Sequence, residues 1–191
     1  MNRLKHLEIE DLNPEQQALL RAVQNGPRAA MHGRLGLVGP FGVWVRAPRV
    51  GNAAQAFGAA VRFETTLAEA VKEIAICTVG AHFKAKFEFA AHGPLAIAAG
   101  VDPAAVDAIR RGAIPELAAP AEALAYEIAS TLLTRHRLSD QQYQRARAVF
   151  SETELVELVT VIGYYCQISL TLNAFEVPLS EHMADPFPEV G

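Results

Sequence analysis

The sequence is poor in cysteine, which limits redox and zinc chemistry. Its two cysteines, Cys77 and Cys166, lie far apart and form no CxxC motif. Two thiols are also too few for a structural zinc site. We favour two buried thiols in a reducing compartment, while a nucleophilic Cys77 stays open as an alternative.

Long apolar runs and blocks of basic residues are missing too. No apolar run approaches the roughly 20 residues that a membrane-spanning helix needs, and the basic residues in 1–6 have no apolar stretch behind them, unlike a signal peptide. The net charge is −4, with acidic and basic residues mixed. We therefore expect a cytoplasmic protein with neither a nucleic-acid nor a membrane partner.

Motifs that bind common cofactors do not occur. The sequence has no GxGxxG, phosphate loop, HExxH or GxSxG. His32, His136 and His182 show no metal-ligand spacing with one another. The sequence therefore gives no reason to expect a cofactor or a metal.

The composition is that of an ordinary globular domain. Of the 191 residues, 51% are hydrophobic and 20% charged, which is enough to bury a core. No segment alternates with a period of two between hairpin turns, and neither a repeat nor a linker divides the chain. We predict an all-α fold of seven or eight helices, in a single domain spanning residues 1–191.

Helix boundaries can be read from prolines, glycines and capping residues. A cap residue before a proline, or a proline alone, marks helix starts at 14, 48, 103 and 120. Three capping boxes are predicted, at Thr66–Glu69, Ser139–Gln142 and Ser151–Glu154. Glycines 26, 80, 100 and 112 are expected to end helices. The remaining expected segments are a loop over 32–42 and helices over about 83–99, 120–135 and 152–174.

The helix over 152–174 and the tail after it differ from the rest. The helix is apolar over more than one face, which in so small a protein suggests burial against another subunit. The tail after Pro178 is rich in proline and is expected to be extended.

Glu88 and His92 are the main candidates for chemistry. At 100° per residue they lie 40° apart on the helix over 83–99, in the middle of its face of small apolar residues. Such groups are costly there unless they pair, and their i,i+4 spacing allows pairing. Burial would then tune both for acid–base catalysis near neutral pH. The alternative is a structural ion pair or a satisfied core histidine. Gly93-Pro94 predicts a kink just after His92.

Three further residues have a functional and a structural interpretation. Glu73, on the preceding helix, is placed to contact His92, or it only interacts favourably with the helix dipole. Arg62 is able to bind a substrate carboxylate in a bidentate manner, or it covers a helix end. His82 lies at a helix junction, where an exposed or capping role is expected.

The sequence resembles the carboxymuconolactone decarboxylase family, which includes alkyl hydroperoxidase D. The resemblance covers most of residues 39–178 and is carried by RFETTL at 62–67, KEIAI at 72–76, FEFAAH at 87–92, Gly100, Gly163-Tyr164-Tyr165 and LNAF at 172–175. It implies an all-helical bundle that assembles as a homotrimer or a homohexamer.

The resemblance also separates two branches of this family. The peroxidase branch has a Glu, a CxxC twelve residues later, and a His four residues after the second Cys. Glu73 and His92 match the outer positions, but Ala85 and Glu88 occupy the cysteine positions. We therefore expect no disulfide-based peroxidase activity.

The Glu–x–x–x–His form looks like the decarboxylase branch. It implies cofactor-free decarboxylation of a small carboxylated lactone or keto acid, in which His92 and Glu88 supply the proton and Glu73 completes the catalytic group. Arg62 or Lys84 would then bind the substrate carboxylate. Two other hypotheses stay open: a redox protein of the hydroperoxidase type, and a non-catalytic helical oligomer that binds a small molecule or partner, with Glu88 and His92 packed dry.

Overall fold

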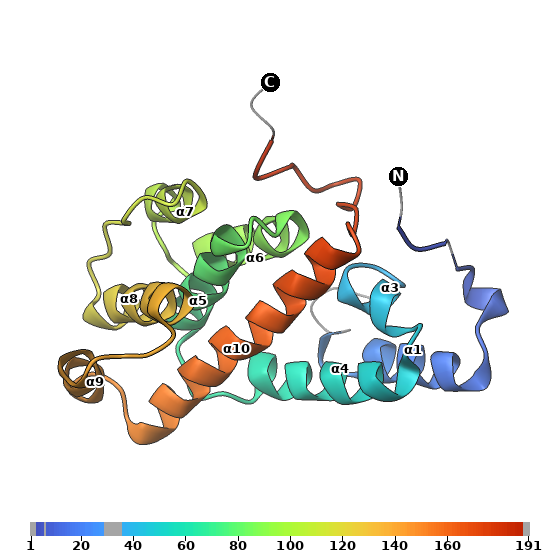
Figure 1. The fold of residues 1–191 in the computed structure, drawn as a ribbon, viewed down its shortest axis with the longest axis horizontal. Helices are drawn as coiled ribbons and strands as arrows, with labels where there is room; N and C mark the ends of the chain where they lie inside the picture. Colours follow the sequence, from blue (N-terminus) through green and yellow to red (C-terminus); the bar gives the residue numbers. More distant parts are fainter. Residues whose placement is uncertain (1–2, 6, 29–35, 189–191) are drawn as a thin grey trace.

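All regular secondary structure in the described part of the chain is helical. The computed structural model describes residues 3–5, 7–28 and 36–188. Within them, nine α-helices and one short 3-10 helix are found and no strand, which confirms the predicted all-α fold class (Figure 1). The elements are η1 (Ile9–Asp11), α1 (Pro14–Asn25), α3 (Pro40–Trp44), α4 (Pro48–Phe63), α5 (Glu69–His82), α6 (Lys86–Ala98), α7 (Pro103–Arg110), α8 (Pro120–Arg135), α9 (Asp140–Arg147) and α10 (Glu152–Ala174).

Helix α5 is the centre of the core. It packs against α6, α7, α8 and α10 (Figure 1). As a result, eleven consecutive residues, from Val71 to Ala81, are buried. A helix that is covered on all sides places even its polar residues in the interior, and Glu73 is one of them.

Most of the predicted helix starts are correct, because they depend on local hydrogen bonds. Asn13, Ser139 and Ser151 each accept a hydrogen bond from a backbone amide three residues on, and each is part of a complete capping box. Asp102 accepts a hydrogen bond from the amide of Ala104. The starts at Pro48 and Pro120 are also found.

The capping box predicted at Thr66 and Glu69 is wrong. The helix starts only at Glu69, and no side chain caps it. The backbone amide and the hydroxyl of Thr66 instead donate to the carboxylate of Glu157 on α10, each at 2.8 Å. Glu69 forms ion pairs with Arg62 and Lys72. Thr66 and Glu69 thus each bind charged partners elsewhere, and no capping box forms between them.

The predicted end of α5 at Gly80 is also wrong, since the helix continues to His82. Gly100 and Gly112, which do follow helices, have the positive φ values of +99° and +73° that such ends require. Gly80 has no positive φ, and it lies buried against the start of α6. The positive φ of this turn falls on Lys84 instead, and α6 starts at Lys86 rather than at 83. Pro94 lies within α6, which continues to Ala98.

The loop predicted over 32–42 lies outside the described residues up to 35, and its second half is partly helical. Helix α3 starts at Pro40, directly after Gly39, whose φ is +56° and ψ is −139°. A Cβ atom on Gly39 would lie 2.7 Å from the ring of Phe87. Glycine is therefore required here both by its backbone conformation and by the aromatic ring against it.

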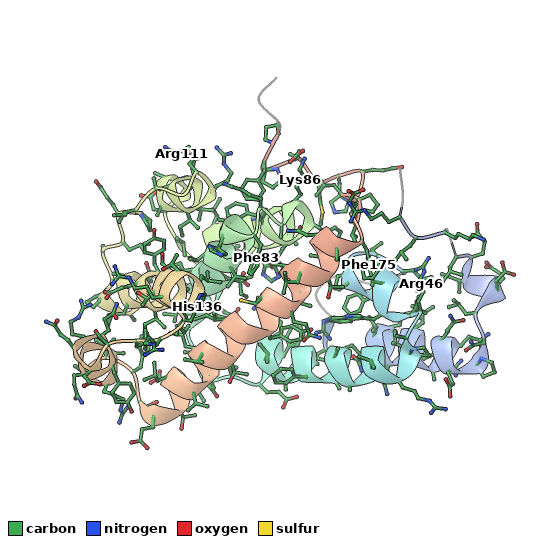
Figure 2. All side chains as sticks on the ribbon, in the orientation of Figure 1. Arg46, Phe83, Lys86, Arg111, His136 and Phe175 are labelled. Atoms are coloured by element: carbon green, nitrogen blue, oxygen red, sulfur yellow. The ribbon has the colours of Figure 1, made fainter. Side chains whose placement is uncertain are left out.

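The C-terminal segment folds back over α6 after α10 ends. Lys86, labelled in Figure 2, forms an ion pair with Asp185 at 2.7 Å. The backbone carbonyl of Pro186 accepts a hydrogen bond from Arg110, and the ring of Phe187 packs edge-on against Phe89. This segment therefore covers part of the surface above α6.

Helix α10 is long and apolar enough to cross a membrane by length and composition alone, with a mean hydropathy of 1.5 over 18 residues. Half of that window is buried inside the protein. Core helices of globular proteins have the same length and composition, so these properties are weak evidence for a membrane span.

One exposed face of α10 carries apolar residues. Val156, Val159 and Leu170 are 67%, 43% and 56% exposed, and the space next to Gly163 is open. The expected homotrimer or homohexamer stays a prediction. If it uses this face, Val159→Glu should lower the molecular mass measured by light scattering toward that of one chain. An unchanged multimeric mass would show that α10 is not in the interface.

Candidate active site

A cavity of about 310 Å³ opens between the two ends of the chain and the core helices. Its walls come from Arg28 after α1, from α3, α4, α6 and α10, and from the C-terminal segment. The lining residues are Arg28, Val38, Pro40, Phe41, Arg62, Phe63, Phe87, Glu88, Ala91, His92, Leu95, Tyr164, Tyr165, Ile168, Ser180, His182 and Met183. The volume is at the lower end of the range for small-molecule sites, about 300–1,000 Å³.

Four charged side chains form a continuous row beside this cavity. Nη2 of Arg62 lies 2.6 Å from Oε1 of Glu73. Oε2 of Glu73 forms a 2.7 Å hydrogen bond with Nδ1 of His92. Nε2 of His92 lies 3.2 Å from Oε1 of Glu88. The two outer contacts have ion-pair distances without hydrogen-bond alignment, since both Oε1 atoms have no hydrogen-bond partner among the described residues.

Three helices bring this row together. Arg62 lies in the last turn of α4, and Glu73 in the second turn of the buried helix α5. Glu88 and His92 lie one turn apart on α6, which packs closely along α5. The predicted contact between Glu73 and His92 is therefore present, together with the i,i+4 pairing of Glu88 and His92.

The depth of each group differs along the row. Glu73 is 1% exposed and does not line the cavity, whereas Glu88 and His92 do. His92 thus links an interior carboxylate to a carboxyl group at the cavity wall. Its ring also packs edge-on against Tyr165, with 5.0 Å between ring centres, which fixes its orientation.

Burial controls the protonation of Glu88. Burial raises the pKa of this carboxyl, His92 and Arg62 oppose the shift, the charge of Glu73 adds to it, and the resulting pKa is about 7. The group therefore exchanges its proton near neutral pH, as a general acid or base requires.

For His92, burial and the neighbouring carboxylates shift the pKa in opposite directions. Burial alone lowers its pKa, but the charge and hydrogen bond of Glu73, together with the charge of Glu88, outweigh this and raise it. A protonated imidazole is thus stabilised between the two carboxyl groups. Because one nitrogen is bound to Glu73, the other is directed toward Glu88.

Of the two cations expected to bind substrate, only Arg62 lines the cavity. Its guanidinium is already engaged by Glu69 at 2.9 Å and by Glu73 at 2.6 Å. Lys84 lies in the turn between α5 and α6, where its ammonium group lies 4.8 Å from the centre of the Phe187 ring. The fold therefore does not bring Lys84 to the cavity wall.

The two thiols are separate from each other and unpaired. Burial raises the pKa of Cys77 well above its ordinary value, and the charges of Glu73 and Glu88 add to this effect. The nucleophilic thiolate is therefore strongly disfavoured, which supports an inert thiol. His82 is exposed, as expected for its place at a helix junction.

Sequence patterns gave no functional role to Arg28 or to the pair Tyr164 and Tyr165, although all three line the cavity. The tyrosines are part of the family resemblance. Two adjacent hydroxyl-bearing residues within an apolar helix are the one sequence pattern that could have indicated their place at the site. Arg28 lies three residues after the end of α1 and belongs to no motif. Groups of three or more His, Cys, Asp or Glu side chains arranged to hold a metal are not found in the described ranges.

Comparison with known proteins places this architecture in a known class. The chain has the fold of the alkylhydroperoxidase AhpD core. The crystal structure of an alkylhydroperoxidase AhpD core, an uncharacterized peroxidase-related protein from Ralstonia eutropha JMP134, matches with a TM-score of 0.76 over 94% of this chain and 93% of the other, at 14% identity. An uncharacterized peroxidase-related protein from Silicibacter sp. TM1040 matches with a TM-score of 0.67 over 94% and 92%, at 16% identity. No family model and no curated protein matches the sequence.

Proposed function

We propose that this protein is a cofactor-independent acid–base enzyme of the carboxymuconolactone decarboxylase type, acting on a small carboxylated lactone or keto acid. The main support is the position of Glu88. Its carboxyl group is buried at the cavity wall, its pKa is raised to about 7, and one of its oxygens has no hydrogen-bond partner within the described residues.

Decarboxylation would proceed with Glu88 as the proton donor. The carbon–carbon bond to the departing carboxylate breaks, and its electron pair moves into the neighbouring carbonyl system as an enolate. Glu88 transfers its proton to the carbon, and carbon dioxide leaves. His92, held as the imidazolium by Glu73, then returns a proton to Glu88 and takes up another from water, so each turnover consumes one proton from solvent. Arg62 compensates the charge of Glu73.

The same groups suit proton transfer without loss of carbon dioxide. Glu88 in its carboxylate form would remove a proton next to a carbonyl and return it to another position. This is an isomerase or tautomerase reaction, and it uses the same raised pKa. We therefore choose a test that detects both reactions.

The alternative is a peroxidase, which the names of the two structural neighbours suggest for those proteins. This chain has no CxxC motif for a dithiol cycle. Burial raises the pKa of Cys77 and so disfavours its thiolate form. Consumption of hydrogen peroxide or of an alkyl hydroperoxide with a thiol reductant would favour the alternative over the acid–base reaction.

The test follows small keto acids and lactone acids in D₂O by proton NMR. We expect deuterium incorporation or decarboxylation with the wild type, and a loss of about 100-fold or more with His92→Asn. His136→Asn is the matched control, because His136 is exposed at the far end of α8 in a left-handed conformation that asparagine tolerates (Figure 2). Equal rates for wild type and His92→Asn would contradict the proposal.

A further inference from the structure

Arg28 is a cation at the cavity wall whose charge is balanced by no carboxylate of the described residues. Its Nη1 donates a 3.2 Å hydrogen bond to the backbone carbonyl of Gln55. Its guanidinium lies 5.4 Å from the ring centre of Phe41 and 5.9 Å from that of Phe63. Within the described ranges no carboxylate forms an ion pair with it, in contrast to Arg62, which has two.

Its surroundings make this charge costly without an anion. Burial lowers the pKa of Arg28, Tyr164 and Tyr165 oppose this shift, and the nearby charge of Arg62 adds to it. A half-buried guanidinium against two aromatic rings has lost part of its hydration, and an anion that enters the cavity would restore the lost stabilisation. The guanidinium has five N–H donors, and its partners are the carbonyl of Gln55 and the hydroxyl of Tyr164, so donors remain for a carboxylate contact.

The rest of the cavity indicates what the anion would carry. Apolar side chains from four elements line it, among them Phe41, Phe87 and Ile168. Arg62 is already neutralised by Glu69 and Glu73, so it has no charge to spare for a second carboxylate. The lining therefore fits one carboxylate attached to an apolar body.

We propose that Arg28 is the carboxylate receptor of this site and that it selects small amphipathic carboxylates. The inference builds on the proposed function, because Arg28 and Glu88 line the same cavity. A ligand held by its carboxylate at Arg28 can extend its apolar part along the wall and present a carbon to Glu88. Arg28 is then a binding residue that determines specificity, and it replaces Arg62 and Lys84 in that role.

The test uses two unreactive probes that differ only in charge, 3-phenylpropanoate and its neutral amide. Their dissociation constants are measured by ligand-observed NMR with the wild type, Arg28→Gln, Arg28→Lys and the control Arg49→Gln. Arg49 is a suitable control because it is exposed and paired with Glu15 outside the cavity. Circular dichroism and thermal unfolding establish that each variant is folded.

We expect the wild type to bind the acid about 10-fold to 100-fold more tightly than the amide. Arg28→Gln should abolish this preference, Arg28→Lys should restore part of it, and Arg49→Gln should keep it. If the wild type shows no preference, or if folded Arg28→Gln keeps it, Arg28 is only a tether between α4 and the aromatic rings and the inference is wrong.

The outcome separates the two proposals. Acid binding that depends on Arg28, combined with unchanged proton exchange in His92→Asn, would support the carboxylate receptor and contradict the proposed chemistry. Exchange that depends on His92, without a preference for the acid, would support the chemistry and contradict the receptor.

Discussion

Replacing Glu88 by glutamine should lower the proposed proton-transfer rate by about 100-fold to 10,000-fold while the protein stays folded. Glutamine keeps the shape of the side chain but has no proton to give near neutral pH. The carboxyl group is nearly neutral below its pKa of about 7, so the core tolerates an uncharged amide in its place. Turnover in the D₂O assay and thermal unfolding measure the two parts of this expectation.

The same substitution should also change how stability depends on pH. Burial raises the pKa of Glu88 from 4.5 to about 7 in the folded protein, so the folded state holds this proton more tightly than the unfolded chain does. The free energy of unfolding should therefore fall as pH rises from about 4.5 to about 7, by about 3 kcal/mol at most for this group. Glu88→Gln should remove that fall.

His92 contributes in the same direction but over a different range. Its pKa is raised above 6.5 because Glu73 outweighs the effect of burial. Its stabilisation is fully present below 6.5 and is lost as pH rises through the folded value. Urea unfolding of the wild type and Glu88→Gln at about pH 5 and about pH 8 isolates the contribution of Glu88, with Glu116→Gln, an exposed carboxylate, as the control. Equal pH dependence in wild type and Glu88→Gln would mean that Glu88 ionises normally.

Replacing Arg62 by methionine should cost about 3–5 kcal/mol of unfolding free energy. Methionine fills much of the same space, but it leaves the carboxylate of Glu73, which is 1% exposed, without its arginine partner. The control is Arg49→Met, which breaks an exposed ion pair with Glu15 and should change nothing measurable. Urea unfolding of both variants at the same pH makes the comparison.

A double variant tests the cause. Arg62→Met with Glu73→Gln removes the uncompensated charge together with its partner, so part of the lost stability should return. If the double variant is no more stable than Arg62→Met, the cost comes from packing rather than from the buried carboxylate.

The fold was predictable where local contacts decide it. Asn13, Asp102, Ser139 and Ser151 cap helices through amides two or three residues away, so the sequence contains the whole interaction. Thr66 failed as a cap because its partner, Glu157, is 91 residues away. Gly80 failed as a helix end because it lacks the positive φ of Gly100 and Gly112, and the positive φ of that turn falls on Lys84.

The acid–base residues of the site were predictable because they are close in sequence, whereas the cavity walls were not. Glu88 and His92 share one turn of one helix, and Glu73 lies on the neighbour joined to it by a short turn. The walls of the cavity come from much further away in the sequence. Arg28 reaches the site only because α1 packs along α4, and no spacing rule connects it to His92.

The acid–base row is built on the central helices, whereas much of the cavity wall comes from the two ends of the chain. Glu73 is buried on α5, which packs against α6, α7, α8 and α10. Ser180, His182 and Met183 belong to a peripheral segment held to α6 by an exposed ion pair. In protein engineering this separates two tasks. Mutant libraries confined to residues 178–188 and to the residues around Val38 should change which ligands the cavity binds, while Glu73, Glu88 and His92 keep their positions.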